Sequence, residues 1–157
     1  NFVDMNVSGM AVFPLDNPHI FSRVNHLIEN QMAVITFNSR VEAFIINPSS
    51  AESLKGGRTA AGLVSKICPP DANIGVIISS HNLSCHQDRL RGFEDKLAEL
   101  NSDFKILDIQ ENQDRKDDAF RITLEYCNNY PKLGAIYLTS GGITGVASAL
   151  EIAEKHS

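Results

Sequence analysis

The sequence predicts an α/β fold in which parallel strands form a doubly wound sheet with helices on both faces. Short apolar runs alternate with amphipathic stretches along most of the chain. The clearest unit spans residues 73–100, where Ile74–Ile78 reads as a buried strand and residues 79–84 as a polar turn. Apolar residues then recur at helical spacing, at Leu90, Phe93, Leu97 and Leu100. Alternation of this kind is typical of parallel sheets with right-handed crossovers.

The remaining elements follow the same pattern in order. Strands are expected at residues 10–13, 32–37, 43–46, 104–109 and 135–138. Helices are expected from apolar stripes over residues 20–28, 54–67, 120–127 and 146–153, with Gly56-Gly57 weakening the second of these. Pro14, Pro48, Pro69-Pro70 and Pro131 end elements, because proline cannot donate a backbone hydrogen bond.

One connection breaks the alternation. The strands ending at Phe37 and beginning at Ala43 are joined by too few residues for a parallel crossover within one sheet. We therefore expect the chain to pass from one sheet to another here, with a hinge at residues 38–47. This places residues 1–40 in part of an N-terminal lobe and residues 41–157 in part of a C-terminal lobe.

The length, composition and net charge of the chain limit the class of protein to which it can belong. The chain has 157 residues, 43% hydrophobic and 21% charged, which suits a folded domain with a core. Its net charge of −5 disfavours nucleic-acid binding by this stretch. No apolar run is long enough to span a bilayer, and no signal-like segment opens the chain. Three cysteines at irregular spacing fit neither a disulfide framework nor a zinc site, which favours a cytoplasmic location.

Several short motifs, in order, resemble a known family. They are residues 8–16 (SGMAVFPLD), similar to DGIIIxPxD; 33–39 (AVITFNS), similar to PVVTxD; 57–61 (GRTAA), similar to GRxAA; 89–93 (RLRGF), similar to RxxGF; and 130–137 (YPKLGAIY), similar to xPDLxAIx. Their order resembles the type I periplasmic-binding fold, shared by LacI-type transcription regulators and ribose/galactose-type sugar-binding proteins. Domains of that family are roughly twice as long, in two lobes. The resemblance therefore implies that parts of both lobes lie outside these 157 residues.

The resemblance also assigns a ligand site. Its motif positions place sugar-binding side chains at five residues, all in loops after strands: Asp16, Asn38, Arg89, Gln113 and Ser140. Amide, carboxylate and guanidinium groups are suited to sugar hydroxyls, because they form paired hydrogen bonds. The match is incomplete: Glu52-Ser53 stand where the family has Asp-Asn, and Ser140-Gly141-Gly142 where it often has Asn-Asp.

Each of these residues has a simpler interpretation. Arg89 could be a surface arginine paired with Asp88 or Glu94, and either Asp16 or Asn17 could cap the following helix. Asn38 could simply end a strand, and Gln113 could be an ordinary loop residue. Ser140, with the two glycines after it, could begin a helix whose N–H groups bind an anion.

The first functional hypothesis is a sugar-sensing effector domain of a LacI-type regulator, a homodimer that contacts DNA only through a module outside this stretch. The alternative is an extracytoplasmic sugar-binding protein of an ABC transporter. An enzyme is a remote third possibility, because adjacent residues such as Cys85-His86 do not face each other on a helix and so form no catalytic triad. We expect no cofactor, no metal and no membrane partner.

Overall fold

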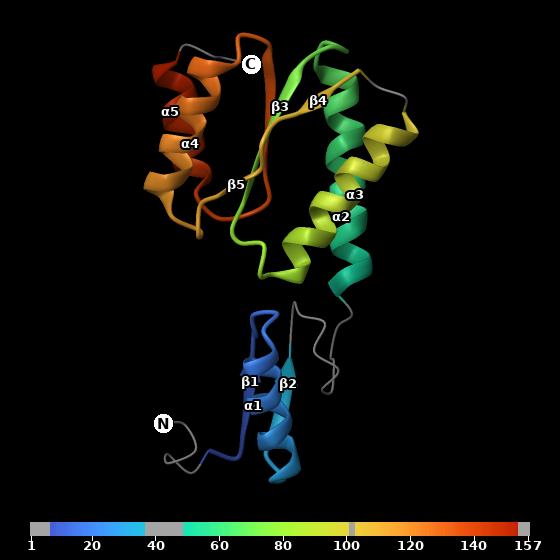
Figure 1. Cartoon of the computed structure of the whole chain (residues 1–157), viewed down its shortest axis with the longest axis vertical. Helices are drawn as coiled ribbons and strands as arrows, with labels where there is room; N and C mark the ends of the chain where they lie inside the picture. The colour runs from blue at the N-terminus through green and yellow to red at the C-terminus, as the bar shows by residue number, and fades with distance from the viewer. Residues whose placement is uncertain (1–6, 37–48, 101–102, 154–157) are drawn as a thin grey trace.

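The computed structural model describes residues 7–36, 49–100 and 103–153. In chain order their elements are β1 (Gly9–Val12), α1 (Pro18–Glu29), β2 (Ala33–Thr36), α2 (Ser49–Ile67), β3 (Asn73–Ile78), α3 (Ser84–Glu99), β4 (Lys105–Ile106), β5 (Gln110–Glu111), α4 (Lys116–Asn129), β6 (Leu133–Leu138) and α5 (Ile143–Ile152). Figure 1 shows them as a small β1–α1–β2 unit and a larger sheet with its helices. The predicted α/β fold with parallel sheets is confirmed.

The small unit is one parallel strand pair covered by one helix. β1 and β2 pair with Gly9 opposite Ala33 and continue in register to the ends of both strands. Val24 of α1 and Val34 of β2 are buried between the helix and the sheet. Asn17 begins the helix, because its side-chain oxygen accepts the backbone N–H of His19 at 2.9 Å.

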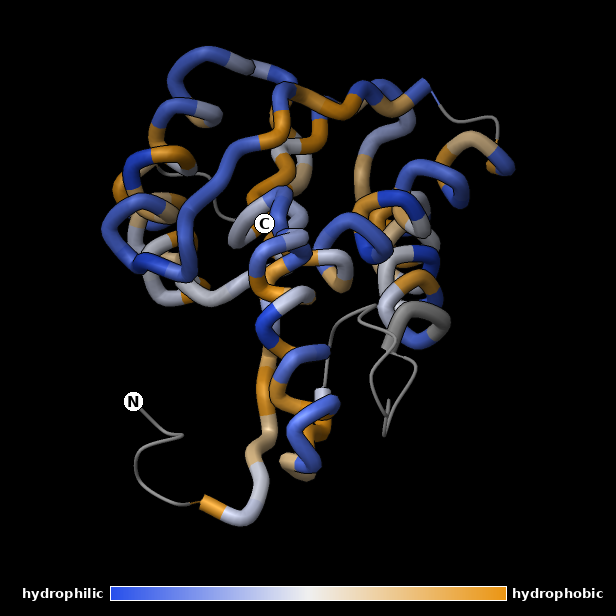
Figure 2. Tube along the Cα trace, turned by 60° about the horizontal axis from the view of Figure 1, so that its bottom comes forward, coloured by the Kyte–Doolittle hydropathy of each residue, from blue (hydrophilic) through white to orange (hydrophobic). Residues whose placement is uncertain are grey.

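The larger sheet is built around β3. β6 pairs with one edge of β3, while β4 and β5 pair with the two ends of its other edge, all in parallel. Ile74, Val76 and Ile78 pack into the core beneath α2 and α3, whereas Ile77 packs beneath α4 and α5. The run is therefore buried on both faces, as predicted. Figure 2 shows apolar segments along the strands and on the inward sides of the helices.

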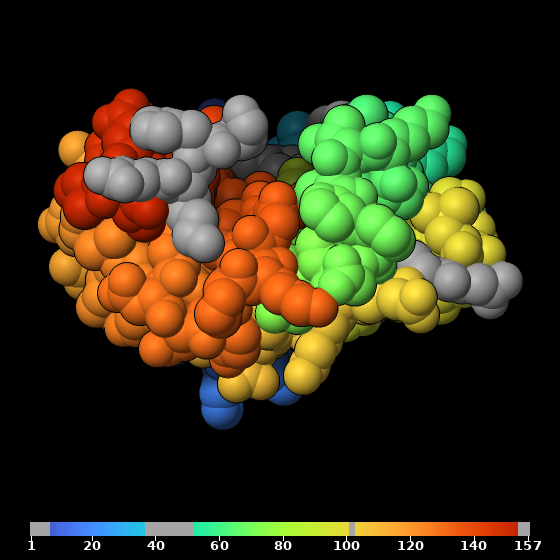
Figure 3. Space-filling model, turned by 90° about the horizontal axis from the view of Figure 1, so that it is seen from above, coloured from blue at the N-terminus to red at the C-terminus, as the bar shows by residue number. Residues whose placement is uncertain are grey.

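Helices cover the two faces of this sheet as two separate pairs. Seen from the end away from the small unit, residues of α4, β6 and α5 lie on one side and those around the end of α2 on the other (Figure 3). Glycines allow each pair to approach closely. A Cβ on Gly145 of α5 would lie 2.2 Å from the Lys116 carbonyl oxygen of α4. Only a residue without a side chain fits there.

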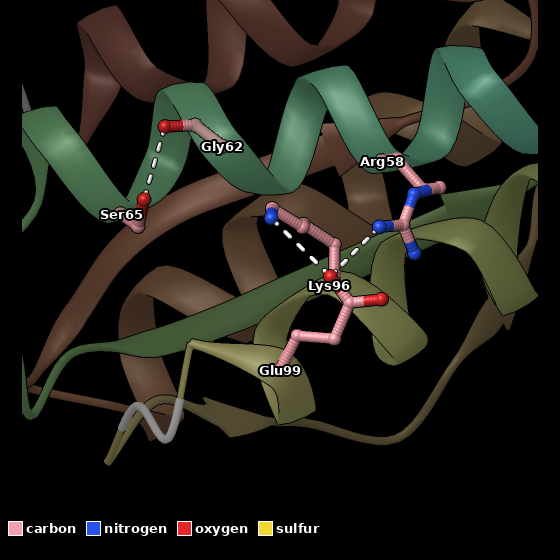
Figure 4. A network of polar contacts seen from close by, with 5 residues as sticks. All are labelled: Arg58, Gly62, Ser65, Lys96 and Glu99. Carbon is pink, nitrogen blue, oxygen red and sulfur yellow. Dashed lines mark hydrogen bonds and ion pairs between the residues drawn. The ribbon is translucent and has the colours of Figure 1, made fainter.

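The pair α2 and α3 is held by two such contacts. A Cβ on Gly57 would lie 1.9 Å from the Arg89 carbonyl oxygen, and one on Gly92 would lie 2.1 Å from the Leu54 carbonyl oxygen. These glycines belong to the GR and RGF motifs, so part of each motif has a packing role. Beyond them, Glu99 of α3 accepts hydrogen bonds from Arg58 of α2 at 2.7 Å and from Lys96 at 3.3 Å (Figure 4).

Some element predictions need correction. The strand predicted over residues 104–109 is interrupted: only Lys105–Ile106 and Gln110–Glu111 pair with β3. Leu100 lies past the end of α3 and is 41% exposed, so it does not continue the buried stripe. Of the apolar residues expected to form the inward face of α4, Ile122, Tyr126 and Cys127 are buried, whereas Phe120 and Leu124 are only partly buried. The predicted strand at 43–46 and the predicted hinge at 38–47 both lie outside the described residues, and the division into two lobes remains a prediction.

Candidate ligand-binding groove

The loops that follow β1, β3, β5 and β6 meet between the two sheets. In Figure 1 the lower end of the larger sheet faces the upper end of β1. The backbone N–H of Asp16, after β1, donates to the carbonyl of Asn82, after β3, at 2.9 Å. In open α/β sheets the carboxyl ends of strands are where ligands bind, so this junction is the place to look for a site.

A groove of about 360 Å³ lies at this junction. Its apolar wall comes from the small unit and consists of Phe13 and Leu15, which are 41% and 45% exposed. The other residues that line it come from the larger sheet and are mostly polar: Ser79, Ser80, Asn82, Leu83, Glu111, Gln113 and Asp114. Small-molecule sites commonly have this size, with apolar surface and a few placed polar groups.

A network of hydrogen bonds fixes the polar wall. The Asp114 carboxylate accepts the Gly141 N–H at 2.7 Å and the Ser79 hydroxyl at 2.8 Å. Asn112, fully buried, donates to the Gly141 carbonyl at 2.6 Å and accepts the Ser140 hydroxyl at 2.8 Å. These side chains join the loops after β3, β5 and β6, and backbone bonds such as that from the Gln113 N–H to the Ser79 carbonyl, at 3.0 Å, join them further.

This network keeps Asp114 ionised. Burial alone would raise the pKa of its carboxyl group, but the hydrogen bonds from Gly141 and Ser79, together with nearby His86, outweigh burial and hold the pKa below its usual value. The polar wall therefore carries a negative charge at neutral pH.

The backbone after β5 is strained at two consecutive residues. Gln113 has φ of 50° and Asp114 has φ of 58°, in the left-handed region that residues with a side chain rarely adopt. Such strain costs roughly 1–3 kcal/mol per residue and clusters at ligand sites, where surrounding contacts maintain it. Here it turns the exposed Gln113 side chain toward Glu111, to which it donates at 2.9 Å.

Behind the groove, α3 holds the loop after β6 through one residue. Arg89 donates from Nη1 to the Thr139 carbonyl at 3.1 Å, and His86 Nδ1 lies 2.8 Å from the Thr139 hydroxyl. Burial lowers the pKa of His86, the Arg89 charge lowers it further, and Asp114 opposes both effects. His86 is therefore neutral at neutral pH.

The structure locates four of the five predicted site residues near this groove. Gln113 lines it. Ser140 belongs to the hydrogen-bonded loop after β6 beside it, and Arg89 lies in α3 and donates to the same loop. The Asp16 side-chain oxygen Oδ1 is buried and has no hydrogen-bond partner within the described residues. Asn38 lies outside the described residues.

Two of the simpler interpretations are wrong. Asn17, not Asp16, accepts the capping hydrogen bond of α1. The arginine that pairs with Asp88 is Arg91, at 3.4 Å, whereas Arg89 turns toward Thr139.

Sequence reasoning missed most of the polar wall. Asn112 and Asp114 act through partners 25 or more residues away, such as Gly141 at 27 and 29 residues, so no local motif marks them. Phe13 was assigned only to a strand. The informative signal is position along the chain: each missed residue lies within three residues after a strand, at the edge of the sheet where ligands bind.

Other chemistry has little support in the described part of the chain. No group of three or more His, Cys, Asp or Glu side chains there could hold a metal ion. No helix of residues 7–36, 49–100 or 103–153 is both long and apolar enough to cross a membrane. Burial raises the pKa of the Cys85 thiol, so this cysteine is a poor nucleophile at neutral pH.

Comparison with known proteins fits this architecture. A family model described as a periplasmic binding protein domain matches residues 1–156. The chain belongs to this family.

Solved structures resemble the chain at low sequence identity. They include the XylFII molecule, with 20% identity and a TM-score of 0.82 over 96% of this chain and 56% of that one. GanP, a glucose-galactose binding protein from Geobacillus stearothermophilus, has 22% identity and a TM-score of 0.79 over 98% and 55%. An ABC transporter solute binding protein from Agrobacterium vitis with bound D-fucose has 18% identity and a TM-score of 0.80 over 98% and 54%.

At these identities the likeness establishes the fold. The chain spans about half the length of each of these structures. No curated protein matches the chain.

Proposed function

We propose that this chain forms part of a sugar-binding protein that holds a neutral monosaccharide in the groove between its two sheets. The supporting observation is the groove itself, with an apolar wall from Phe13 and Leu15 facing a wall of hydroxyl, amide and carboxylate groups. A sugar ring has apolar C–H faces and a rim of hydroxyls, so it complements both walls. GanP is a glucose-galactose binding protein, and the Agrobacterium vitis protein holds D-fucose, which are sugars of this kind.

The charge of the groove favours an uncharged ligand. Glu111 and Asp114 line it, and none of the described lining residues is Arg or Lys. A sugar phosphate would bring two negative charges beside these carboxylates, and like charges at close range repel strongly where water is partly excluded. Neutral pentoses and hexoses avoid this penalty.

Within this proposal the predicted site residues have different roles. Gln113 contacts the ligand directly, and Asp16, whose buried Oδ1 has no hydrogen-bond partner within the described residues, directly follows Leu15 of the opposite wall. Ser140 contributes from the loop after β6, Arg89 contributes from α3 by holding that loop, and Asn38 contributes from outside the described residues.

We propose that the full-length protein is an extracytoplasmic receptor of a sugar ABC transporter. Structural neighbours such as the ABC transporter solute binding protein of Agrobacterium vitis support this alternative over the first hypothesis, a LacI-type regulator. Nothing among these structures supports regulation or DNA binding. A secretion signal ahead of residue 1 in the complete gene would support the receptor, whereas a helix-turn-helix module there would contradict it.

Calorimetric titration of the full-length protein tests the binding proposal. Neutral pentoses and hexoses should include at least one saturable ligand, and the corresponding sugar phosphates should bind far more weakly. Phe13→Ala and Glu111→Gln should each weaken binding, by about 1–3 kcal/mol for loss of the apolar wall or of a charged hydrogen-bond acceptor.

Matched controls come from the surface away from the groove. Leu63, 57% exposed on α2, and Glu151, exposed on α5, give Leu63→Ala and Glu151→Gln. Both should bind like the wild type. A sugar that binds equally well to Phe13→Ala and Glu111→Gln would place the site elsewhere.

A further inference from the structure

His86 is a buried histidine that the proposed site does not use for contact. It is 6% exposed in the first turn of α3 and does not line the groove. Its Nδ1 lies 2.8 Å from the Thr139 hydroxyl. One turn further along α3, Arg89 donates to the carbonyl of the same Thr139 at 3.1 Å. Two residues of α3 therefore contact the hydroxyl and the carbonyl of Thr139.

Thr139 begins the loop that completes the polar wall. Its backbone N–H donates to Ile77 at 2.9 Å, at the end of the β3–β6 pairing. The next two residues, Ser140 and Gly141, bond to Asn112 and Asp114. The position of Thr139 therefore determines whether Asn112 and Asp114 meet their partners.

Charge makes this arrangement sensitive to protonation. The charged groups that act on His86 are Arg89, from its own helix, and Asp114, from the loop after β5. A protonated His86 would place a second cation next to Arg89 in a site largely closed to water. Because burial and Arg89 both disfavour the charged ring, the folded state releases the proton more readily than an unfolded chain does.

We propose that His86 is a positioning residue: its neutral ring helps Arg89 to hold Thr139, and protonation of the ring in acid loosens the loop at residues 139–142 and weakens ligand binding. The inference about the ligand rests on the proposed function, whereas the inference about the loop does not.

The sign of the effect follows from linkage. The pKa of His86 lies below its unfolded value of 6.5, so the folded loop is fully stabilised above about 6.5 and loses this contribution as the pH falls through that value toward the lower folded pKa. Asp114 does not confound the measurement, because its pKa is lowered from 3.8 and it stays ionised at about pH 5.

Amide hydrogen exchange of the full-length protein, corrected for intrinsic rates, tests the loop at about pH 7.5 and about pH 5. The Gly141 amide should lose protection several-fold in acid in the wild type. In His86→Gln, which keeps a hydrogen-bonding side chain but cannot titrate there, protection should be the same at both pH values. His86→Ala should be poorly protected at both.

The control and the ligand experiment separate the possible failures. His26, exposed on α1, gives His26→Gln, which should retain the full pH dependence. With the sugar found by calorimetry, affinity should fall several-fold in acid for the wild type but not for His86→Gln. If no sugar binds, the proposed function fails while exchange still decides the role of His86. An equal pH dependence in His86→Gln, or none in the wild type, would overturn the inference.

Discussion

The contact between α2 and α3 makes a sharp prediction, because two adjacent glycines in α2 have opposite surroundings. A Cβ on Gly57 would lie 1.9 Å from the Arg89 carbonyl oxygen and 2.9 Å from the Phe93 nitrogen, whereas a Cβ on Gly56 would meet nothing within 4 Å. Gly57→Ala therefore forces α3 outward by about 1.5 Å, since protein interiors leave no spare space. Gly56→Ala requires no movement.

The expected energies have opposite signs. Overpacking typically costs about 1–3 kcal/mol, and more where backbone atoms must move. Replacing glycine by alanine within a helix stabilises the folded protein by about 0.8–1.0 kcal/mol through helix propensity. Gly57→Ala should therefore destabilise the full-length protein by about 1–2 kcal/mol, and Gly56→Ala should stabilise it by slightly under 1 kcal/mol.

Urea unfolding followed by circular dichroism measures both variants against the wild type. Gly92→Ala, which would meet the Leu54 carbonyl oxygen at 2.1 Å, should behave like Gly57→Ala. Because Arg89 belongs to the displaced backbone, Gly57→Ala should also weaken sugar binding. Equal unfolding midpoints for Gly56→Ala and Gly57→Ala would refute the packing argument.

Three further predictions concern side-chain hydrogen bonds. The Tyr126 hydroxyl donates to the carbonyls of Val76, at 3.0 Å, and Asp108, and burial raises its pKa to about 12. In urea unfolding, Tyr126→Phe should therefore lower the free energy of unfolding by about 1–3 kcal/mol, whereas the control Tyr130→Phe should change it little. The hydrogen bond from Arg58, reinforced by Lys96, lowers the pKa of Glu99 to about 2. The ionised Glu99 carboxylate therefore stabilises the fold above the unfolded pKa of 4.5, and this contribution is lost as the pH falls toward about 2. An NMR titration of the Glu99 carboxyl group with a midpoint near 4.5 would contradict this. In calorimetry, Asp114→Asn should weaken sugar binding by about 1.5–3 kcal/mol, whereas the exposed control Asp117→Asn should not. Equal affinities of the two variants would mean that the hydrogen bonds of Asp114 do not contribute to the sugar site.

Local sequence patterns predicted the parts of this fold that depend on local chemistry. The β-branched run at Ile74–Ile78 is buried on both faces, and Leu90, Phe93 and Leu97 form the inward face of α3. Each pattern reflects one strand or one helix packing against a single core, which the order of residues records directly.

The polar wall depends instead on contacts between distant parts of the chain. Asn112 could not be recognised as buried, because its partners Ser140 and Gly141 lie 28 and 29 residues away. The same is true of Gly57, whose role appears only when Arg89 of another helix lies against it. The interruption between β4 and β5 also escaped prediction, because residues 104–109 alternate in part, as a strand would.

The expected homodimer remains a prediction. Size-exclusion chromatography with light scattering on the full-length protein would test it directly.

Amide hydrogen exchange with and without sugar is the most direct test of whether a sugar binds between the two sheets. The full-length protein would be measured alone and with a saturating mixture of neutral pentoses and hexoses. We expect the sugars to slow exchange only in the loops around the groove, at residues 13–17, 79–84, 111–115 and 139–142. Unchanged exchange in these four loops, or protection only at a distant surface such as the outer side of α1, would contradict a sugar site between the two sheets.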